Sequence, residues 1–118
     1  MDAGSNMKAR LRADLRRVMK ERRTTEAKVI RALVAAIDNA EAPPVRAQRS
    51  EPLQHRFHGR SAEVERLLLS RSDVRNVLLR EMHERERAAE ELEHLKMLDQ
   101  ASALRAEALL AKRYITAE

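Results

Sequence analysis

The sequence predicts an all-α protein: a four-helix, bundle-like arrangement of two antiparallel helical hairpins. Apolar residues recur with helical spacing in four stretches, and the 118 residues include only two Gly and three Pro to interrupt them. There is one Tyr and one Phe, so the predicted core is aliphatic. Abundant Ala, Leu, Glu and Arg, all good helix formers, favour the same fold class.

The single domain is predicted to span residues 7–118, preceded by a disordered tail at residues 1–6. Ser5 or Asn6 is expected to cap the first helix, since either side chain can accept a hydrogen bond from a free backbone N–H. The helix itself is predicted over Met7–Arg22. Its apolar stripe falls at i, i+4, i+7 and i+8: Leu11, Leu15, Val18 and Met19.

The second predicted helix holds the most regular amphipathic stretch, Lys28–Ala42, which is expected to supply the centre of the core. Thr24 or Thr25 is expected to cap this helix, with Glu26 in the first turn, where the helix dipole favours an acid. Pro43-Pro44 should end it, because a proline ring fixes φ and removes the backbone N–H. The apolar stripe consists of Val29, Ile30, Leu33, Val34 and Ile37.

A long irregular connection is predicted over residues 43–70, which contain all three prolines, one of the two glycines and little periodicity. A connection of this length is often functional. Three polar residues precede it: Asp38, Asn39 and Glu41. Acids at a helix C-terminus oppose the helix dipole, so we expect these residues to have a specific role, such as anchoring the connection through Arg46 or Arg49.

The second hairpin begins where Ser70 or Ser72 can cap a third helix, in a variant of the capping box that uses Asp73. This helix is predicted to run to Lys96, and its apolar stripe is thin in the middle, around residues 84–87. Such a stripe could serve as a docking or self-association surface.

A fourth helix is predicted over Gln100–Ile115, with Asp99 as its cap. The connection to the third helix is short, so the two helices should be antiparallel neighbours. Four leucines are expected to pack together near this connection: Leu92, Leu95, Leu98 and Leu104.

The positive charge is concentrated in the first half of the chain. The net charge is +5, of which residues 1–60 contribute +7 and residues 61–118 contribute −2. One interpretation is two solvated helix surfaces of different composition. The functional interpretation is a basic face toward a polyanion, with folded RNA as the first choice because stacking aromatics are scarce. The residues expected to form this face are Arg10, Arg12, Arg16, Arg17, Lys20, Arg23 and Arg31.

No motif predicts catalysis, and no catalytic residue, metal or cofactor is expected. The chain has no Cys, and His55 and His58 lack the further ligands that a zinc site requires. The many carboxylates of the third helix are expected to lie among arginines on an open surface, whereas acid–base catalysis needs a cleft that shifts their pKa. No apolar stretch approaches the ~20 residues of a membrane span or forms a signal sequence, so a cytoplasmic location is expected.

Several short motifs follow one another along the chain: Leu11–Leu15, Met19–Arg22, Val29–Leu33, Ala35–Ala42, Ser72–Arg75, Glu81–Arg85, Ala88–Leu92, Leu104–Ala108 and Tyr114-Ile115. In this order they resemble the GatB/YqeY-like family in its actinobacterial form, over nearly the whole chain apart from the tail and the connection. The run Asp38–Glu41 is the most family-like. The family usually continues past a Tyr-Leu-Pro into a small second helical domain. Here Tyr114–Thr116 stands in that place, so the resemblance implies a form without that domain.

The resemblance implies a helical bundle similar to the tail of the B subunit of the tRNA-dependent Asp/Glu amidotransferase. That enzyme is a carbon–nitrogen ligase that uses glutamine as amide donor, and its tail helps to hold tRNA while catalysis lies elsewhere. A YqeY-like chain is therefore expected to be a non-catalytic accessory module whose partner is tRNA or a tRNA-modifying enzyme. The alternative is a protein–protein interaction or self-association module with no RNA role.

Overall fold

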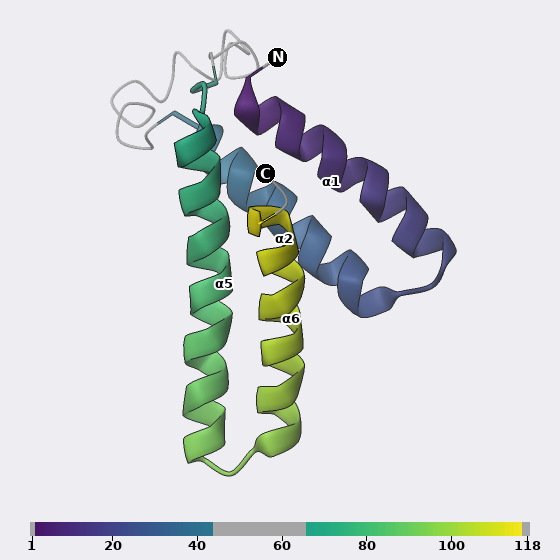
Figure 1. The fold of residues 1–118 in the computed structure, drawn as a ribbon, viewed down its shortest axis with the longest axis vertical. Coiled ribbons are helices and arrows are strands. Elements are labelled where there is room, and N and C mark those ends of the chain that lie inside the picture. Colours follow the sequence, from purple (N-terminus) through teal and green to yellow (C-terminus); the bar gives the residue numbers. More distant parts are fainter. Residues whose placement is uncertain (1, 44–65, 117–118) are drawn as a thin grey trace, which may run out of the picture.

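The computed structural model describes residues 2–43 and 66–116, which form helices and no strand (Figure 1). The helices are α1 (Ala3–Lys20), α2 (Thr24–Glu41), α5 (Arg71–His94) and α6 (Leu98–Thr116). The α1–α2 pair and the α5–α6 pair are antiparallel hairpins that pack together near one end, so that their tips diverge. The predicted all-α fold of two hairpins is confirmed.

The α2 helix lies at the centre of the core and packs against each of the other three helices. Leu33 and Ile37 of its predicted stripe are fully buried, and Val34 is half-buried. The other three helices contribute Leu11, Val18, Val74, Val77, Leu78, Ala111, Tyr114 and Ile115 to the same core. The core is thus aliphatic as predicted, with one tyrosine at its edge.

The prediction of a disordered tail is wrong for residues 3–6, because α1 already begins at Ala3. The N-cap is Asp2, whose carboxylate accepts a hydrogen bond from the backbone N–H of Ser5 at 3.0 Å. This bond lowers the pKa of Asp2. An acid suits the position because the helix dipole is positive there, and the predicted caps Ser5 and Asn6 lie inside the helix instead.

The turn between α1 and α2 lies earlier in the chain than predicted, because α1 ends at Lys20 and α2 begins at Thr24. Arg22 has φ 60°, in the left-handed region, and the N–H of Arg23 donates to the carbonyl of Val18 at 2.9 Å. These are the marks of a Schellman turn, in which glycine usually occupies the left-handed position. The predicted caps Thr24 and Thr25 are wrong, because both residues already lie inside α2, whose N-cap is Arg23 and has no side-chain capping bond.

Only the last part of the connection predicted over residues 43–70 is described, since residues 44–65 lie outside the described residues. Its final residues are non-helical and return to the end of α2. The N–H of Leu67 donates to the carbonyl of Glu41 at 2.8 Å, and Leu69 is buried in the core.

The α5 helix starts as predicted and ends two residues earlier. Ser70 and Asp73 form a complete capping box, with both side-chain-to-backbone bonds at 3.0 Å. Lys96 has φ 65°, and the N–H of Met97 donates to the carbonyl of Leu92 at 2.9 Å. The second hairpin therefore closes with the same Schellman turn as the first.

The α6 helix begins at Leu98, so Asp99 lies in its first turn rather than capping it. The predicted packing of leucines at this tip is wrong in part, because Leu95 and Leu98 are 68% and 61% exposed. Further along α5 the thin part of the apolar stripe is not an open surface. Ala89 is fully buried there, and Arg85 reaches across to Glu107 of α6 at 3.2 Å.

Candidate nucleic-acid interface

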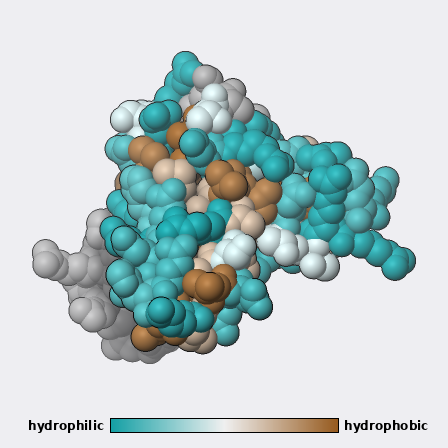
Figure 2. All heavy atoms as spheres, turned by 60° about the horizontal axis from the view of Figure 1, so that its bottom comes forward, coloured by the Kyte–Doolittle hydropathy of each residue, from teal (hydrophilic) through white to brown (hydrophobic). Residues whose placement is uncertain are grey.

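The predicted basic residues gather on the α1–α2 hairpin. Residues 9–31 hold nine Lys and Arg against three Asp and Glu, a net charge of +6. This hairpin tip projects to the right of the molecule in Figure 1, and the same side is hydrophilic in Figure 2. The tip is therefore a basic projection rather than one face of a compact bundle.

Three of the predicted residues form a row on the outward face of α1. Arg12, Arg16 and Lys20 are spaced by four residues, which places them one above another on a helix. All three are exposed, and none has an ion-pair partner among the described residues. These three cations are free to meet an external anion.

Two other predicted residues are already paired with carboxylates. Arg17 lies 3.6 Å from Asp14 and 3.8 Å from Glu21, and Arg23 lies 3.1 Å from Glu21 and 3.0 Å from Glu26. Partial burial alone would raise the pKa of Glu26, but its bonds to arginine outweigh that effect and lower it. Arg17 and Arg23 therefore offer less uncompensated charge than the row on α1.

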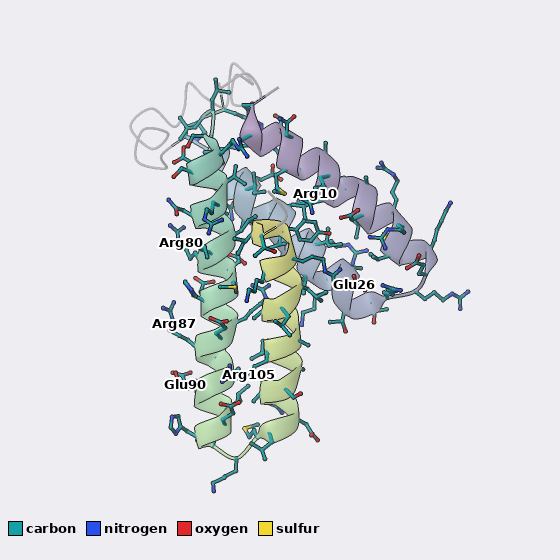
Figure 3. The ribbon with its side chains drawn as sticks, in the orientation of Figure 1. Arg10, Glu26, Arg80, Arg87, Glu90 and Arg105 are labelled. Carbon is teal, nitrogen blue, oxygen red and sulfur yellow. The ribbon has the colours of Figure 1, made fainter. Side chains whose placement is uncertain are left out.

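Arg10 and Arg31 point to different places. Arg10 lies over the ring of Tyr114 on α6, 4.8 Å from its centroid, and thus faces the junction of the two hairpins (Figure 3). Arg31 is on α2, with its guanidinium 3.6 Å from the Sδ of Met19 at the α1–α2 tip. The structure thus brings Arg31, but not Arg10, toward the basic tip.

A hollow of about 340 Å³ lies at this tip between the ends of α1 and α2. It is lined by Val18, Met19, Arg22, Arg23, Thr24, Ala27 and Arg31. Arg22 was not among the residues predicted for the basic face, although the Arg22-Arg23 doublet before a helix start was a visible signal. Aliphatic side chains and three guanidinium groups share this hollow.

The motif residues Asp38 and Glu41 belong to a second charged group, which we call the salt cluster: Lys8, Asp38, Glu41 and Arg66. Lys8 Nζ lies 2.8 Å from Asp38 and 2.6 Å from Glu41, and Arg66 lies 3.1 Å from Glu41. Lys8 and Glu41 are buried. Burial alone would lower the pKa of Lys8, but its two carboxylate partners outweigh this effect and raise it.

The salt cluster fulfils the anchoring role predicted for the motif in a different form. Arg66, at the end of the connection, makes the contact, whereas the predicted Arg46 and Arg49 lie outside the described residues. Asn39 is exposed and takes no part. Gly4 packs so closely on this cluster that a Cβ there would collide with the Glu41 carboxylate. The cluster is thus a structural junction of α1, α2 and the returning chain.

The carboxylates of α5 all lie at exposed or half-buried positions. Arg80, Arg87 and Glu90 project away from the helix into solvent (Figure 3). The part of the chain that the structure describes contains no group of three side chains able to hold a metal ion, and His55 and His58 lie outside it.

None of the four described helices combines the length and apolar character needed to cross a bilayer.

Comparison of the chain with protein-family models, with curated proteins and with solved structures finds no significant match. Membership of the GatB/YqeY-like family therefore stays a prediction from the motifs, and the basic α1–α2 tip must be interpreted from its own chemistry.

Proposed function

We propose that this protein is a non-catalytic accessory module that holds a folded RNA, with tRNA as the first candidate, against the basic face of the α1–α2 hairpin. The observation that carries the proposal is the row of Arg12, Arg16 and Lys20, exposed and without carboxylate partners among the described residues. The row extends about 12 Å along the helix axis. That length suits a stretch of phosphate backbone better than a single phosphate.

The absence of a stacking platform on the described surface favours recognition of RNA shape. Tyr114 is buried, and its hydroxyl donates to Asp14 at 2.6 Å, so its ring is not available to a base. Proteins that read single-stranded RNA usually stack its bases on aromatic side chains. Contacts made only by Arg and Lys instead position a phosphate backbone without reading its sequence.

The resemblance to the amidotransferase tail supports the same proposal and suggests tRNA, or an enzyme that modifies tRNA, as the partner. In that role the chain would bind and orient, and the chemistry would belong to the partner. The resemblance therefore suggests that this chain binds alongside a glutamine-dependent carbon–nitrogen ligase. No residue of this chain is proposed to act in the ligase reaction.

The proposal is tested by measuring the binding of a fluorescently labelled tRNA across a series of salt concentrations. Wild type should bind at low salt, and the logarithm of the affinity should fall linearly with the logarithm of salt concentration. Changing Arg12, Arg16 and Lys20 to Glu should weaken binding at least about 100-fold at low salt and lower the slope by about three, since each phosphate contact contributes about one.

A matched control carries the same change in charge on the other hairpin. Arg71, Arg80 and Arg87 of α5 are exposed, and changing them to Glu alters the net charge by the same amount. This control should keep most of the affinity. Equal loss in both variants would show attraction by net charge alone, and no binding by wild type at low salt would also contradict the proposal.

A further inference from the structure

The tip of the α5–α6 hairpin exposes an apolar cluster that the fold does not cover. Leu95, Met97 and Leu98 are 68%, 40% and 61% exposed and lie within four consecutive residues. Figure 2 turns this end of the molecule forward and shows brown patches within a mostly hydrophilic surface. Single exposed leucines are ordinary, but a cluster of three large side chains at a projecting turn indicates an interaction surface.

The surroundings of this cluster are acidic. Residues 81–107 hold eight Asp and Glu against four Lys and Arg, a net charge of −4. Glu91 and Asp99 flank the turn, are exposed and have no ion-pair partner among the described residues. Lys96 is the one cation within the turn itself. A partner for this tip should therefore combine an apolar recess with positive charge.

The same chain carries such a recess at its other tip. The hollow between α1 and α2 is lined by Val18, Met19 and Ala27 together with arginines that include Arg22 and Arg31. Met19 is 52% exposed there, and neither Arg22 nor Arg31 has a carboxylate partner among the described residues. The acidic, apolar tip and the basic, apolar hollow are complementary in charge and in hydrophobicity.

We propose that copies of this protein associate head to tail, with the α5–α6 tip of one copy seated in the α1–α2 hollow of the next. Leu95 and Met97 would fill the hollow, while Glu91 and Asp99 would face its arginines. The two tips of one molecule diverge, so the contact can form only between molecules (Figure 1). A contact between two different surfaces does not close on itself as a twofold dimer does, and it generates chains or rings.

The contact should be weak and sensitive to salt. Stable interfaces bury roughly 800 Å² on each partner, and three side chains with a charged rim fall short of that area. A dissociation constant on the order of 0.1 mM is the corresponding expectation. The proposal does not rest on RNA binding. RNA on the basic face would compete for Arg22 and Arg31, so the test uses nuclease-treated protein.

The test uses two variants, each of which disables one tip. The tip variant is Leu95→Lys with Met97→Ser; lysine suits the end of α5, and serine suits the start of α6. The hollow variant is Met19→Glu with Arg31→Glu. Leu109 is 65% exposed on α6 away from the tip, so Leu109→Lys is a control with the same change of charge as the tip variant.

Sedimentation equilibrium over a range of concentrations distinguishes the outcomes. Wild type and the Leu109→Lys control should grow beyond dimers, and salt should reverse this growth. Each tip or hollow variant alone should associate at least about tenfold more weakly. An equimolar mixture of the two should form a 1:1 dimer, because each retains the surface that the other lacks, and this result also shows that both are folded.

Three results would overturn the proposal. The first is a wild type that remains monomeric at about 1 mM, well above the expected dissociation constant. The second is a hollow variant that still associates as well as wild type, which would indicate twofold pairing of apolar tips. The third is a mixture of variants with normal circular dichroism that remains monomeric. Loss of tRNA binding in the separate assay would leave all these outcomes unchanged.

Discussion

The two hairpins have the same topology and close with the same Schellman turn. They differ in net charge and in the side chains that pack between their helices. The α2 helix contacts all three other helices, so the α1–α2 hairpin shares the main core along much of its length. The outer half of the α5–α6 hairpin depends on buried alanines, Ala89, Ala101 and Ala108, and on ion pairs such as Arg105 with Glu93 at 2.8 Å. A helix with a wide apolar stripe can pack against several neighbours at the centre of the core, whereas a helix with a thin stripe can extend beyond the core into solvent.

The largest effect on stability is expected when one leucine is removed from the main core and another from the outer part of the α5–α6 hairpin. Leu33→Ala in α2 should lower the free energy of unfolding by about 3–4 kcal/mol, because the side chain is fully buried. Leu104→Ala, at a half-buried position in the outer part of α6, should cost only about 1 kcal/mol. Urea denaturation followed by circular dichroism measures both values. Equal losses would mean that the two hairpins share one core after all.

The salt cluster gives the next largest effect. Lys8→Ala should cost about 2–3 kcal/mol, because it removes a partner from the buried Glu41 carboxylate. Replacing Lys8 and Glu41 together with Met should recover part of this loss, since the buried carboxylate that Lys8→Ala leaves with Arg66 alone is then removed. Lys112→Ala, at an exposed position on α6, is the control and should be close to neutral. A double variant that is no more stable than Lys8→Ala would contradict the expectation.

Tyr114 joins the two hairpins and should make their association sensitive to alkali. Burial raises its pKa, and the hydrogen bond to Asp14 and the charge of Asp14 raise it further. The unfolded chain loses the phenolic proton near pH 10, whereas the folded protein keeps it. Its contribution to stability is therefore complete below pH 10 and is lost as the pH rises from there toward the folded-state pKa.

Tyr114→Phe isolates that contribution. It should cost about 1 kcal/mol at neutral pH, through the lost hydrogen bond, and should flatten the fall of stability above about pH 10. Urea denaturation at a series of pH values gives the two curves. If the wild-type and variant curves stay parallel through this range, Tyr114 does not titrate between the folded and unfolded states.

The smallest expected effects concern the two turns. Arg22 and Lys96 both occupy the left-handed position of a Schellman turn, with φ 60° and 65°. Glycine adopts this conformation without strain, so Arg22→Gly and Lys96→Gly should each stabilise the protein by roughly 0.5–1 kcal/mol. Similar gains in thermal denaturation would show that the turns are equivalent. A loss in one of them would mean that its side chain makes a stabilising contact.

The elements that the sequence predicted well are those set by strong local patterns. The stripe from Val29 to Ile37 identified the central helix, because its spacing is regular and uninterrupted. Ser70 and Asp73 identified the start of α5, because a capping box satisfies two backbone groups at once. The basic character of the α1–α2 hairpin was likewise visible from composition alone.

The remaining features depend on contacts between distant residues or on turns without the usual residues. Neither Schellman turn contains glycine, so both helix ends were predicted two residues too late. The tail predicted at residues 1–6 is helical from Ala3, and Gly4 packs closely against the carboxylate of Glu41, 37 positions away in the sequence. Arg17 and Arg23 were grouped with Arg12 and Arg16, although their spacing of three or four residues from Asp14, Glu21 and Glu26 was a local signal for the ion pairs that they form.

The meeting of Glu41 and Leu67 has a consequence for engineering. Their backbones are joined by a hydrogen bond of 2.8 Å, and the ion pair of Arg66 with Glu41 in the salt cluster holds the same two segments together. The ends of the intervening segment are thus fixed by the fold, whatever the segment's length. For a flexible loop whose ends are held in this way, the entropy of closure grows only with the logarithm of loop length, and each doubling of the length costs only about 0.6 kcal/mol. The junction of Glu41 with Leu67 would therefore hold together the two points at which a longer segment leaves and re-enters the helical part of the chain.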